Sequence, residues 1–315
     1  MKQKALKQKK LRGGRGYRLA PYLFSAPYVI TYCVFTLFPM LFTLFLSFTD
    51  WDGYGEIKLV GFQNYQRMFD ITADPRFFQT LLNTGIIVLL TMPIGIFLGL
   101  FLCYFMQKRA IRGQHVFRVL YYLPALMTAV AVGLLWSTLF DYENGTFNKI
   151  LQALHLTKEN IYFMGTGWGC RLVLALLVIW SSFGSTMLFL SSALRSINEE
   201  VLDAALVDGA GPWKTYWKIS VPMIKQVMIF IVITGLINAF QMYDASVMLF
   251  SSGPSGGLPY GGVDRSCLTM VMLIMEEAFE NMHYGYAAAL SYGMFLCVGV
   301  FSFFSMKMMT REKER

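Results

Sequence analysis

The sequence predicts an all-α membrane protein with six transmembrane helices. Of its 315 residues, 56% are hydrophobic and only 15% are charged, whereas soluble domains carry about 25% charged residues. Long stretches without a charged side chain recur along the chain, and Lys and Arg gather in alternate connections between them. This distribution accounts for the net charge of +8. It argues against a nucleic-acid-binding protein, whose basic residues would form a single patch.

The uncharged stretches define the predicted spans. They cover residues 19–49, 77–107, 119–140, 172–194, 226–243 and 281–306. Each approaches or exceeds the roughly 20 residues that a helix needs to cross the bilayer, once the fifth is extended past Asp244 to Phe250. We expect spans at about 20–48, 77–106, 117–140, 168–194, 223–250 and 283–308, within a membrane domain over 20–310. The first is longer than the roughly 7–15 apolar residues of a signal-peptide core, so we expect an uncleaved span.

The basic residues predict the orientation of these spans. Residues 1–18, 108–118, 195–225 and 307–315 carry 20 of the 27 Lys and Arg residues. Cytoplasmic connections are enriched in Lys and Arg, so we expect cytoplasmic N- and C-termini with tails at 1–19 and 311–315. The segment 196–222 then also faces the cytoplasm. On the outer side we expect short connections, with a short helix around Gln63–Asp70 and another helix at 266–282.

Several kinds of chemistry lack the residues that they need. The five cysteines form no C-x-x-C pair, and the three histidines show no ligand spacing, so we expect neither a disulfide framework nor a metal site. No segment matches G-x-x-x-x-G-K-[ST], so any ATP would be bound by another chain. Gly184-Ser185 lies in an apolar run, as in an intramembrane protease, but no histidine lies deep in a span to act as a base. We expect no catalytic residues.

The charged segment 196–222 has the pattern of two short helices joined by a sharp turn. Ala204 and Ala205 favour helix and leave a low surface that another protein could approach. Gly209 can close a helix in the left-handed conformation, and Pro212 suits the first position of the next helix. Trp213, Tyr216 and Trp217 then share one face of that second helix. The residues alone allow an amphipathic loop on lipid headgroups or a docking site for a soluble partner.

A family resemblance favours the docking site. The segment resembles the "EAA" loop of the membrane subunits of ABC importers, whose pattern is E-A-A-x-x-D-G-A, then an aromatic residue and I-x-L-P. Two departures keep chemical type: Asp203 replaces Glu, and Val221 replaces Leu. The resemblance implies contact with an ATPase subunit through the matching positions, which are Asp203, Ala204, Ala205, Asp208, Gly209, Ala210, Tyr216, Ile219 and Pro222.

Polar residues inside the spans are candidates for a substrate pathway, because they are costly in lipid unless they face a cavity or a neighbouring helix. Sugars suit amide and carboxylate groups combined with flat aromatic faces. Asn238, Gln241 and Asp244 fall within two helical turns and can share one face. For the hydroxyls of the fourth span (Ser181, Ser182, Ser185, Thr186) and for Asn83, helix–helix hydrogen bonding is the alternative. The candidate pathway residues are Asn83, Trp136, Trp180, Asn238, Gln241, Tyr243 and Asp244.

Other segments resemble the permeases of carbohydrate importers. These are Leu37–Pro39, Ser47–Trp51, Gly61–Tyr65, Asn83-Thr84, Asn238–Asp244 with Ser252–Pro254, and Gly285–Ser291. The resemblance implies a type I ABC importer permease fold in an oligosaccharide or glycerol-phosphate type importer of a bacterial or archaeal cell membrane. It implies a second homologous permease subunit as heterodimer partner, two ATPase subunits that carry ATP and Mg²⁺, and an outer solute-binding protein. This chain would bind no cofactor and would not be an enzyme.

The alternative is a secondary transporter or channel that works without ATP. Such a protein would need several buried charges for ion coupling, or inverted repeats. Asp244 is the one acidic residue near membrane depth, and the sequence shows no internal repeat.

Overall fold

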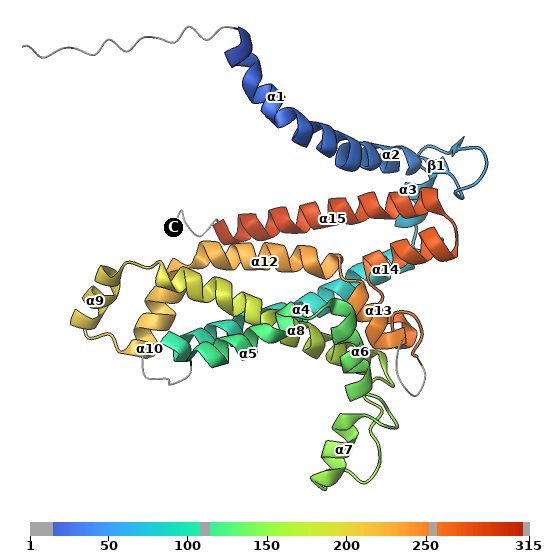
Figure 1. The fold of residues 1–315 in the computed structure, drawn as a ribbon. Helices are drawn as coiled ribbons and strands as arrows, with labels where there is room; N and C mark the ends of the chain where they lie inside the picture. The colour runs from blue at the N-terminus through green and yellow to red at the C-terminus, as the bar shows by residue number, and fades with distance from the viewer. Residues whose placement is uncertain (1–14, 108–113, 252–256, 311–315) are drawn as a thin grey trace, which may run out of the picture.

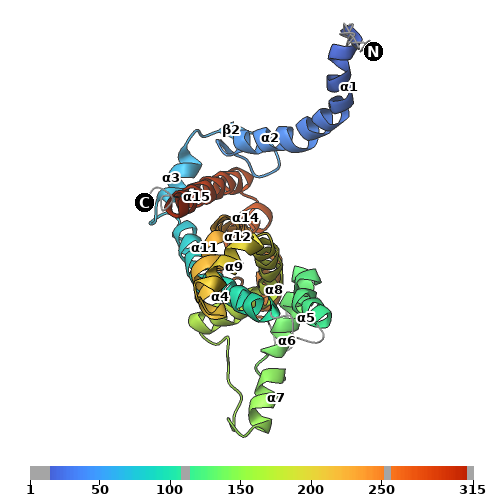
Figure 2. The same cartoon turned by 90° about the vertical axis from the view of Figure 1, so that its left-hand side faces the viewer.

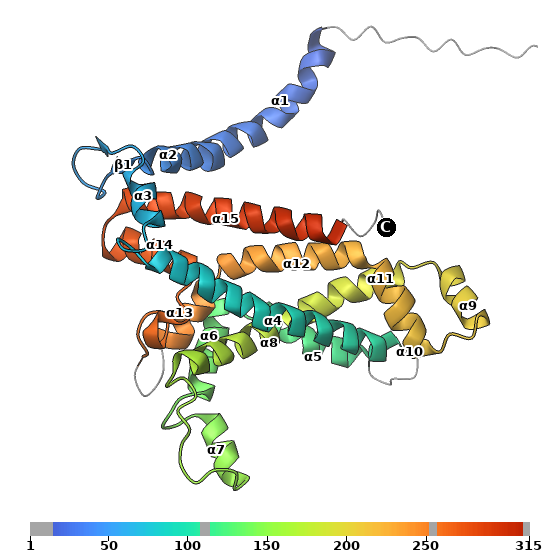
Figure 3. The ribbon, with the colours of Figure 1, turned by 180° about the vertical axis from the view of Figure 1, so that it is seen from behind.

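The structure is a computed structural model that describes residues 15–107, 114–251 and 257–310. Most of the basic tails predicted at 1–19 and 311–315 therefore lies outside the described residues. Within them the chain is a helical bundle whose two ends carry different short elements (Figures 1 and 3). One end holds α9 (Glu199–Val207) and α10 (Pro212–Thr215), and the other holds α3 (Gln63–Phe69) and α14 (Met270–Met275).

The first span stands apart from the other helices. It consists of α1 (Arg15–Tyr32), a π-helical turn over Cys33–Leu37 and α2 (Phe38–Leu46). Only 6% of its most apolar window is buried, and Figure 2 shows it leaving the bundle on the side opposite α7 (Thr146–Ala153). Tyr292 of the last helix anchors it by donating a hydrogen bond to the Met40 carbonyl (2.6 Å). Its exposed apolar side chains suit lipid or another membrane helix.

Three further helices are unbroken and coincide with predicted spans. They are α4 (Arg76–Gln107), α8 (Gly167–Arg195) and α15 (Tyr284–Thr310). Helix α4 packs along α8, and α15 lies beside α12 (Lys225–Phe240). Together with the first span they are the four helices of the described residues that are long and apolar enough to cross a membrane, or up to six if each bent pair counts as one span. The prediction of an all-α polytopic protein is confirmed. The described strands are a two-residue pair, β1 (Thr49–Asp50) with β2 (Lys58–Leu59).

The third and fifth predicted spans are bent, which the sequence analysis did not anticipate. The third consists of α5 (Gln114–Leu126) and α6 (Ala129–Leu139), bent by 103°. Thr128 starts α6 by accepting a hydrogen bond from the Ala131 amide (3.3 Å). The fifth, predicted from residue 223, is entered through α10, a π-helical turn over Tyr216–Ser220 and α11 (Val221–Met223), which lie mostly in the predicted loop 196–222 and meet α12 at 65°. It breaks again at 241–243, before α13 (Asp244–Ser251).

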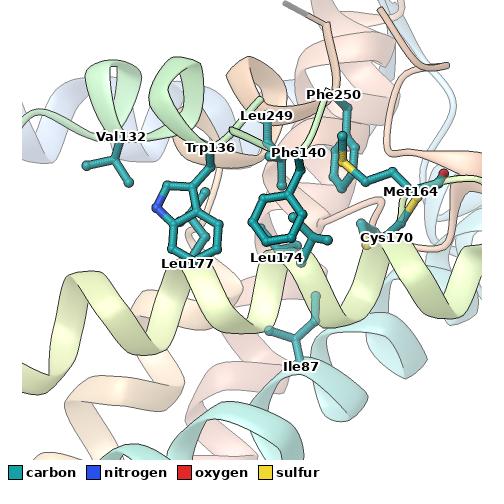
Figure 4. Close-up of a cluster of buried hydrophobic side chains, with 12 residues drawn as sticks. Ile87, Val132, Trp136, Phe140, Met164, Cys170, Leu174, Leu177, Leu249 and Phe250 are labelled. Carbon is teal, nitrogen blue, oxygen red and sulfur yellow. Dashed lines mark hydrogen bonds between the residues drawn. The ribbon is translucent and has the colours of Figure 1, made fainter. Parts of the chain in front are cut away.

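The bend in the third span creates a hydrophobic core near the end of the bundle that is predicted to face outward, which we call the outer core. Side chains of α6 point across α8, and α13 and α4 close the same cluster from two further sides (Figure 4). Gly133 lets α6 pack against α13, because a Cβ there would lie 2.6 Å from the Met248 Cβ. Gly184 does the same for α8, since its Cβ would collide with the Tyr121 carbonyl of α5. Helices in lipid associate through such close packing.

The remaining short elements form a layer at the end of the bundle that is predicted to face outward, which we call the outer layer. They include the predicted short helix α3, and the segment predicted as an outer helix at 266–282 divides into α14 and a π-helical turn over Glu276–Glu280. A single 3₁₀ turn covers Val263–Arg265. Met68, Phe77 and Leu273 are among the fully buried side chains that join α3, α4 and α14 to α15.

A candidate coupling loop and a candidate transport cavity

The segment 199–222 folds as two short helices around a glycine turn, as its sequence predicts. Gly209 has a φ of +74°. The Ala210 amide donates to the Ala205 carbonyl (2.9 Å), and the Gly209 amide donates to the Leu206 carbonyl (3.0 Å). This pattern closes α9 with a left-handed residue. Pro212 then occupies the first turn of α10.

The aromatic face of the second helix fastens this segment to the long helix α4. The Trp213 and Tyr216 rings lie 4.9 and 5.2 Å from the Tyr104 ring, centre to centre, and Trp217 stacks on Phe97 at 6.1 Å. The Tyr216 hydroxyl donates to the Leu100 carbonyl (2.6 Å), and this side chain is buried. These contacts fasten α10 and the turn that follows it to α4.

The residues that match the family's loop pattern divide into an exposed set and a buried or half-buried set. The exposed members are Asp203, Ala204, Asp208, Gly209 and Pro222. Ala205 and Tyr216 are buried, and Ala210 and Ile219 are half-buried. The expectation that both alanines present an open surface is wrong for Ala205, which faces the chain's own interior with 6% exposure. The exposed apolar side chains of α9 and α10 are Val201, Leu206, Val207 and Trp213.

A cavity of about 370 Å³ lies between α4, α8 and α12. Four predicted pathway residues line it: Asn238, Gln241, Tyr243 and Asp244. The side chains of Asn238, Gln241 and Asp244 show no hydrogen bond or ion pair within the described residues, and all three residues are exposed in the single chain. Their polar groups are therefore available to a bound molecule.

Hydroxyl groups line the rest of the polar wall. Ser182, Ser185 and Thr186 belong to the predicted set, whereas Thr91 and Thr234 were not anticipated. The Thr91, Ser185 and Thr234 hydroxyls each donate 2.8 Å hydrogen bonds to carbonyls of their own helices. Such hydroxyls can still accept hydrogen bonds from a molecule in the cavity. Thr91 and Thr234 lie on apolar helices, and their positions in the sequence form no pattern that would predict a cavity.

Three predicted pathway residues do not line this cavity. Trp136 is buried in the outer core, because the bend in the third span turns α6 onto α8. Trp180 packs against it, with ring centres 6.0 Å apart. Asn83 is fully buried and donates to the carbonyls of Arg265 (2.9 Å) and Leu268 (3.2 Å). Asn83 Oδ1 also accepts from Arg171 of α8 (3.0 Å), so this bond is the helix–helix contact that the sequence left as its alternative.

A cluster of buried charges holds the outer layer together, and sequence spacing did not reveal it. Arg76 of α4 pairs with Asp74 (2.8 Å) and with Glu277 (2.6 Å), about 200 residues further along the chain. His283 Nδ1 lies 2.8 Å from the other Glu277 oxygen. Burial favours the neutral form of Glu277, but the hydrogen bonds from His283 and Arg76 outweigh it and hold the pKa below its usual value. The pKa of Asp74 is lowered in the same way, with burial opposed by the Arg76 hydrogen bonds.

The bent membrane helices, the cavity between them and the protruding helical loop together define a membrane transport protein. Residues 71–311 match the family described as "binding-protein-dependent transport system inner membrane component". The chain belongs to this family, and it is a multi-pass membrane permease.

Relatives and solved structures extend the match over nearly the whole chain. "Probable ABC transporter permease protein YesP" of Bacillus subtilis is 31% identical, over 93% of this chain and 91% of its own. "Lactose transport system permease protein LacF" of Rhizobium radiobacter is also 31% identical, with 92% and 93% covered. A crystal structure of a bacterial ABC transporter that imports the acidic polysaccharide alginate matches with a TM-score of 0.77 and 20% identity, covering 94% of this chain and 96% of that one. The prediction of an ABC importer permease of the carbohydrate-uptake kind is confirmed.

Proposed function

We propose that this chain forms half of the membrane pathway of an ATP-driven importer whose substrate is a sugar, in the class of oligosaccharides. The observation that carries the proposal is the cavity wall, where two amides and a carboxylate without internal partners adjoin Tyr243. A sugar ring offers hydroxyls at its edge and C–H groups on its faces. A mostly apolar pocket with a few convergent polar groups suits such a ligand. The lactose permease among the relatives supports this substrate class.

The pathway needs a second subunit. Asn238 and Asp244 lie at the cavity but remain exposed in this single chain, and the first span stays largely uncovered. A homologous permease subunit would close the cavity from the open side as a heterodimer. An extracellular or periplasmic solute-binding protein would deliver the sugar to the outer layer. A complex of the alginate transporter with a ligand-bound periplasmic protein supports this part of the proposal.

The loop 199–222 is proposed to receive work from the ATPase subunits. Two cytoplasmic chains would bind ATP and Mg²⁺, and this chain would bind no cofactor and would carry out no hydrolysis. The exposed apolar residues of α9 and α10 suit a groove on the surface of an ATPase subunit. The aromatic contacts would pass a movement of the loop on to α4. The sugar site would open alternately to the two sides as the spans rotate. Both termini and this loop would lie in the cytoplasm of a bacterial or archaeal cell.

Two measurements on the native host test the proposal. Deleting the gene should abolish uptake of one class of labelled oligosaccharides in a panel, and the tagged chain should co-purify with an ATP-hydrolysing protein. Unchanged uptake of every sugar in the panel would contradict the substrate class. Uptake that persists after ATP is depleted, with the membrane potential maintained, would favour a secondary transporter or channel instead.

A further inference from the structure

The outer segment 261–269 precedes α14 and is fastened to α4 through its backbone. Gln79 Nε2 donates to the Asp264 carbonyl (3.0 Å). Asn83 Nδ2 donates to the Arg265 carbonyl (2.9 Å) and to the Leu268 carbonyl (3.2 Å). Because these bonds end on backbone carbonyls, they fix the path of the segment independently of its side chains.

Helix α8 holds the same segment from a second side. Arg171 Nε donates to the Ser266 carbonyl (3.1 Å), and its Nη2 donates to Asn83 Oδ1 (3.0 Å). Asp264 and Arg265 have φ values of 53° and 52°. Residues other than glycine adopt this left-handed region only where the surroundings enforce it. The segment is therefore a rigid part of the outer layer.

Thr269 joins this rigid segment to the break in the fifth span. Its hydroxyl donates to the Met242 carbonyl (2.6 Å) and accepts a hydrogen bond from the Met272 amide (3.3 Å), so it also starts α14. The side chain is 1% exposed. Met242 lies in the short stretch between α12 and α13, so its carbonyl falls outside both helices. A carbonyl in that position has no partner within either helix, and the Thr269 hydroxyl supplies one.

Tyr260, in the connection between α13 and α14, supports the same region. Its hydroxyl donates to the Met272 carbonyl (3.2 Å), while the Thr269 hydroxyl accepts from the Met272 amide. The first turn of α14 is thus held by two side chains, and Thr269 links it to Met242. The orientation of α13 relative to α12 depends on this link.

We propose that Thr269 is a positioning residue for the transport cavity. Its hydroxyl fixes the break so that Asn238 and Gln241, at the end of α12, and Asp244, at the start of α13, face one ligand. The inference rests on the proposed function, since it assigns the sugar to this cavity. Thr269 itself does not line the cavity and acts through Met242.

Substitutions at Thr269 separate this role from a general effect on folding. Thr269→Val removes the hydroxyl and keeps the shape, whereas Thr269→Ser keeps the hydroxyl. Thr166→Val is the matched control, because Thr166 starts α8 in the same way, by accepting from the Gly169 amide (3.1 Å). Hydrogen exchange of the assembled importer without sugar should show faster exchange at 241–247 in Thr269→Val alone.

Transport kinetics complete the test. Thr269→Val should raise the half-saturating sugar concentration by about three- to tenfold, the range that one hydrogen bond allows, with less change in maximal rate per assembled importer. The half-saturating concentrations of Thr269→Ser and Thr166→Val should stay near the wild-type value. Unchanged exchange in Thr269→Val would overturn the inference, and so would faster exchange with an unchanged half-saturating concentration. If the wild type carries no sugar, the proposed function fails, and the exchange experiment still decides whether Thr269 holds the break.

Discussion

Replacing Gly209 by valine should separate ATP hydrolysis from transport. Gly209 has a φ of +74°, and a Cβ added there would meet no atom within 4 Å. The penalty is therefore one of backbone conformation alone. It amounts to about 1–2 kcal/mol for an ordinary residue in the left-handed region and more for a β-branched one. That is enough to favour other turn geometries about five- to thirtyfold, and α9 would lose its fixed angle to α10.

The assay compares sugar uptake with ATP hydrolysis in purified, reconstituted importers. Gly209→Val should lower the number of sugar molecules carried per ATP several-fold. Gly209→Asn should keep this ratio near the wild-type value, because asparagine tolerates the left-handed region. Gly211→Val is the matched control, because Gly211 has a φ of −64° and equally open surroundings. A Gly209→Val importer that couples as well as the Gly211→Val control would refute the reasoning.

Three further changes have defined outcomes. Tyr216→Phe removes the hydrogen bond to the Leu100 carbonyl and should lower the unfolding free energy by about 1 kcal/mol, as thermal unfolding in detergent would show; an unchanged stability would contradict the anchoring role. Asn238→Ala should raise the half-saturating sugar concentration with little change in stability, and equal kinetics would remove this residue from the site. The depressed pKa of Glu277 contributes stability that is complete above the ordinary carboxyl pKa and is lost as pH falls through the folded-state value. Unfolding of the wild type from pH 7 to pH 3 should therefore depend on pH more steeply than unfolding of Glu277→Gln, and parallel curves would count against the charge cluster.

The fold of the candidate coupling loop was predictable because its signals are local. Gly209, Pro212 and the aromatic spacing act within a few residues, and the structure reproduces the turn and the packed face. The cavity was predictable in part for the same reason: Asn238 and Asp244 lie within two turns of each other.

What the sequence could not reveal depends on partners far along the chain. The break at 241–243 is held by Thr269, which lies 27 residues beyond Met242. Trp136 does not line the cavity because its helix bends by 103° from the preceding one. Pro124 lies in the last turn of α5, but its presence does not give the angle at which α6 leaves. The pairing of Arg76 with Glu277 likewise follows from tertiary structure alone.

Site-specific cross-linking tests the central claim most directly. Val207 is 87% exposed on α9, and Leu156 is 67% exposed in the connection that follows α7. A photoreactive residue placed at Val207 in the native host should cross-link to an ATP-hydrolysing chain, and the same residue at Leu156 should not. The account is contradicted if Val207 captures no such chain, or if a cysteine there reacts with a membrane-impermeant reagent added outside intact cells.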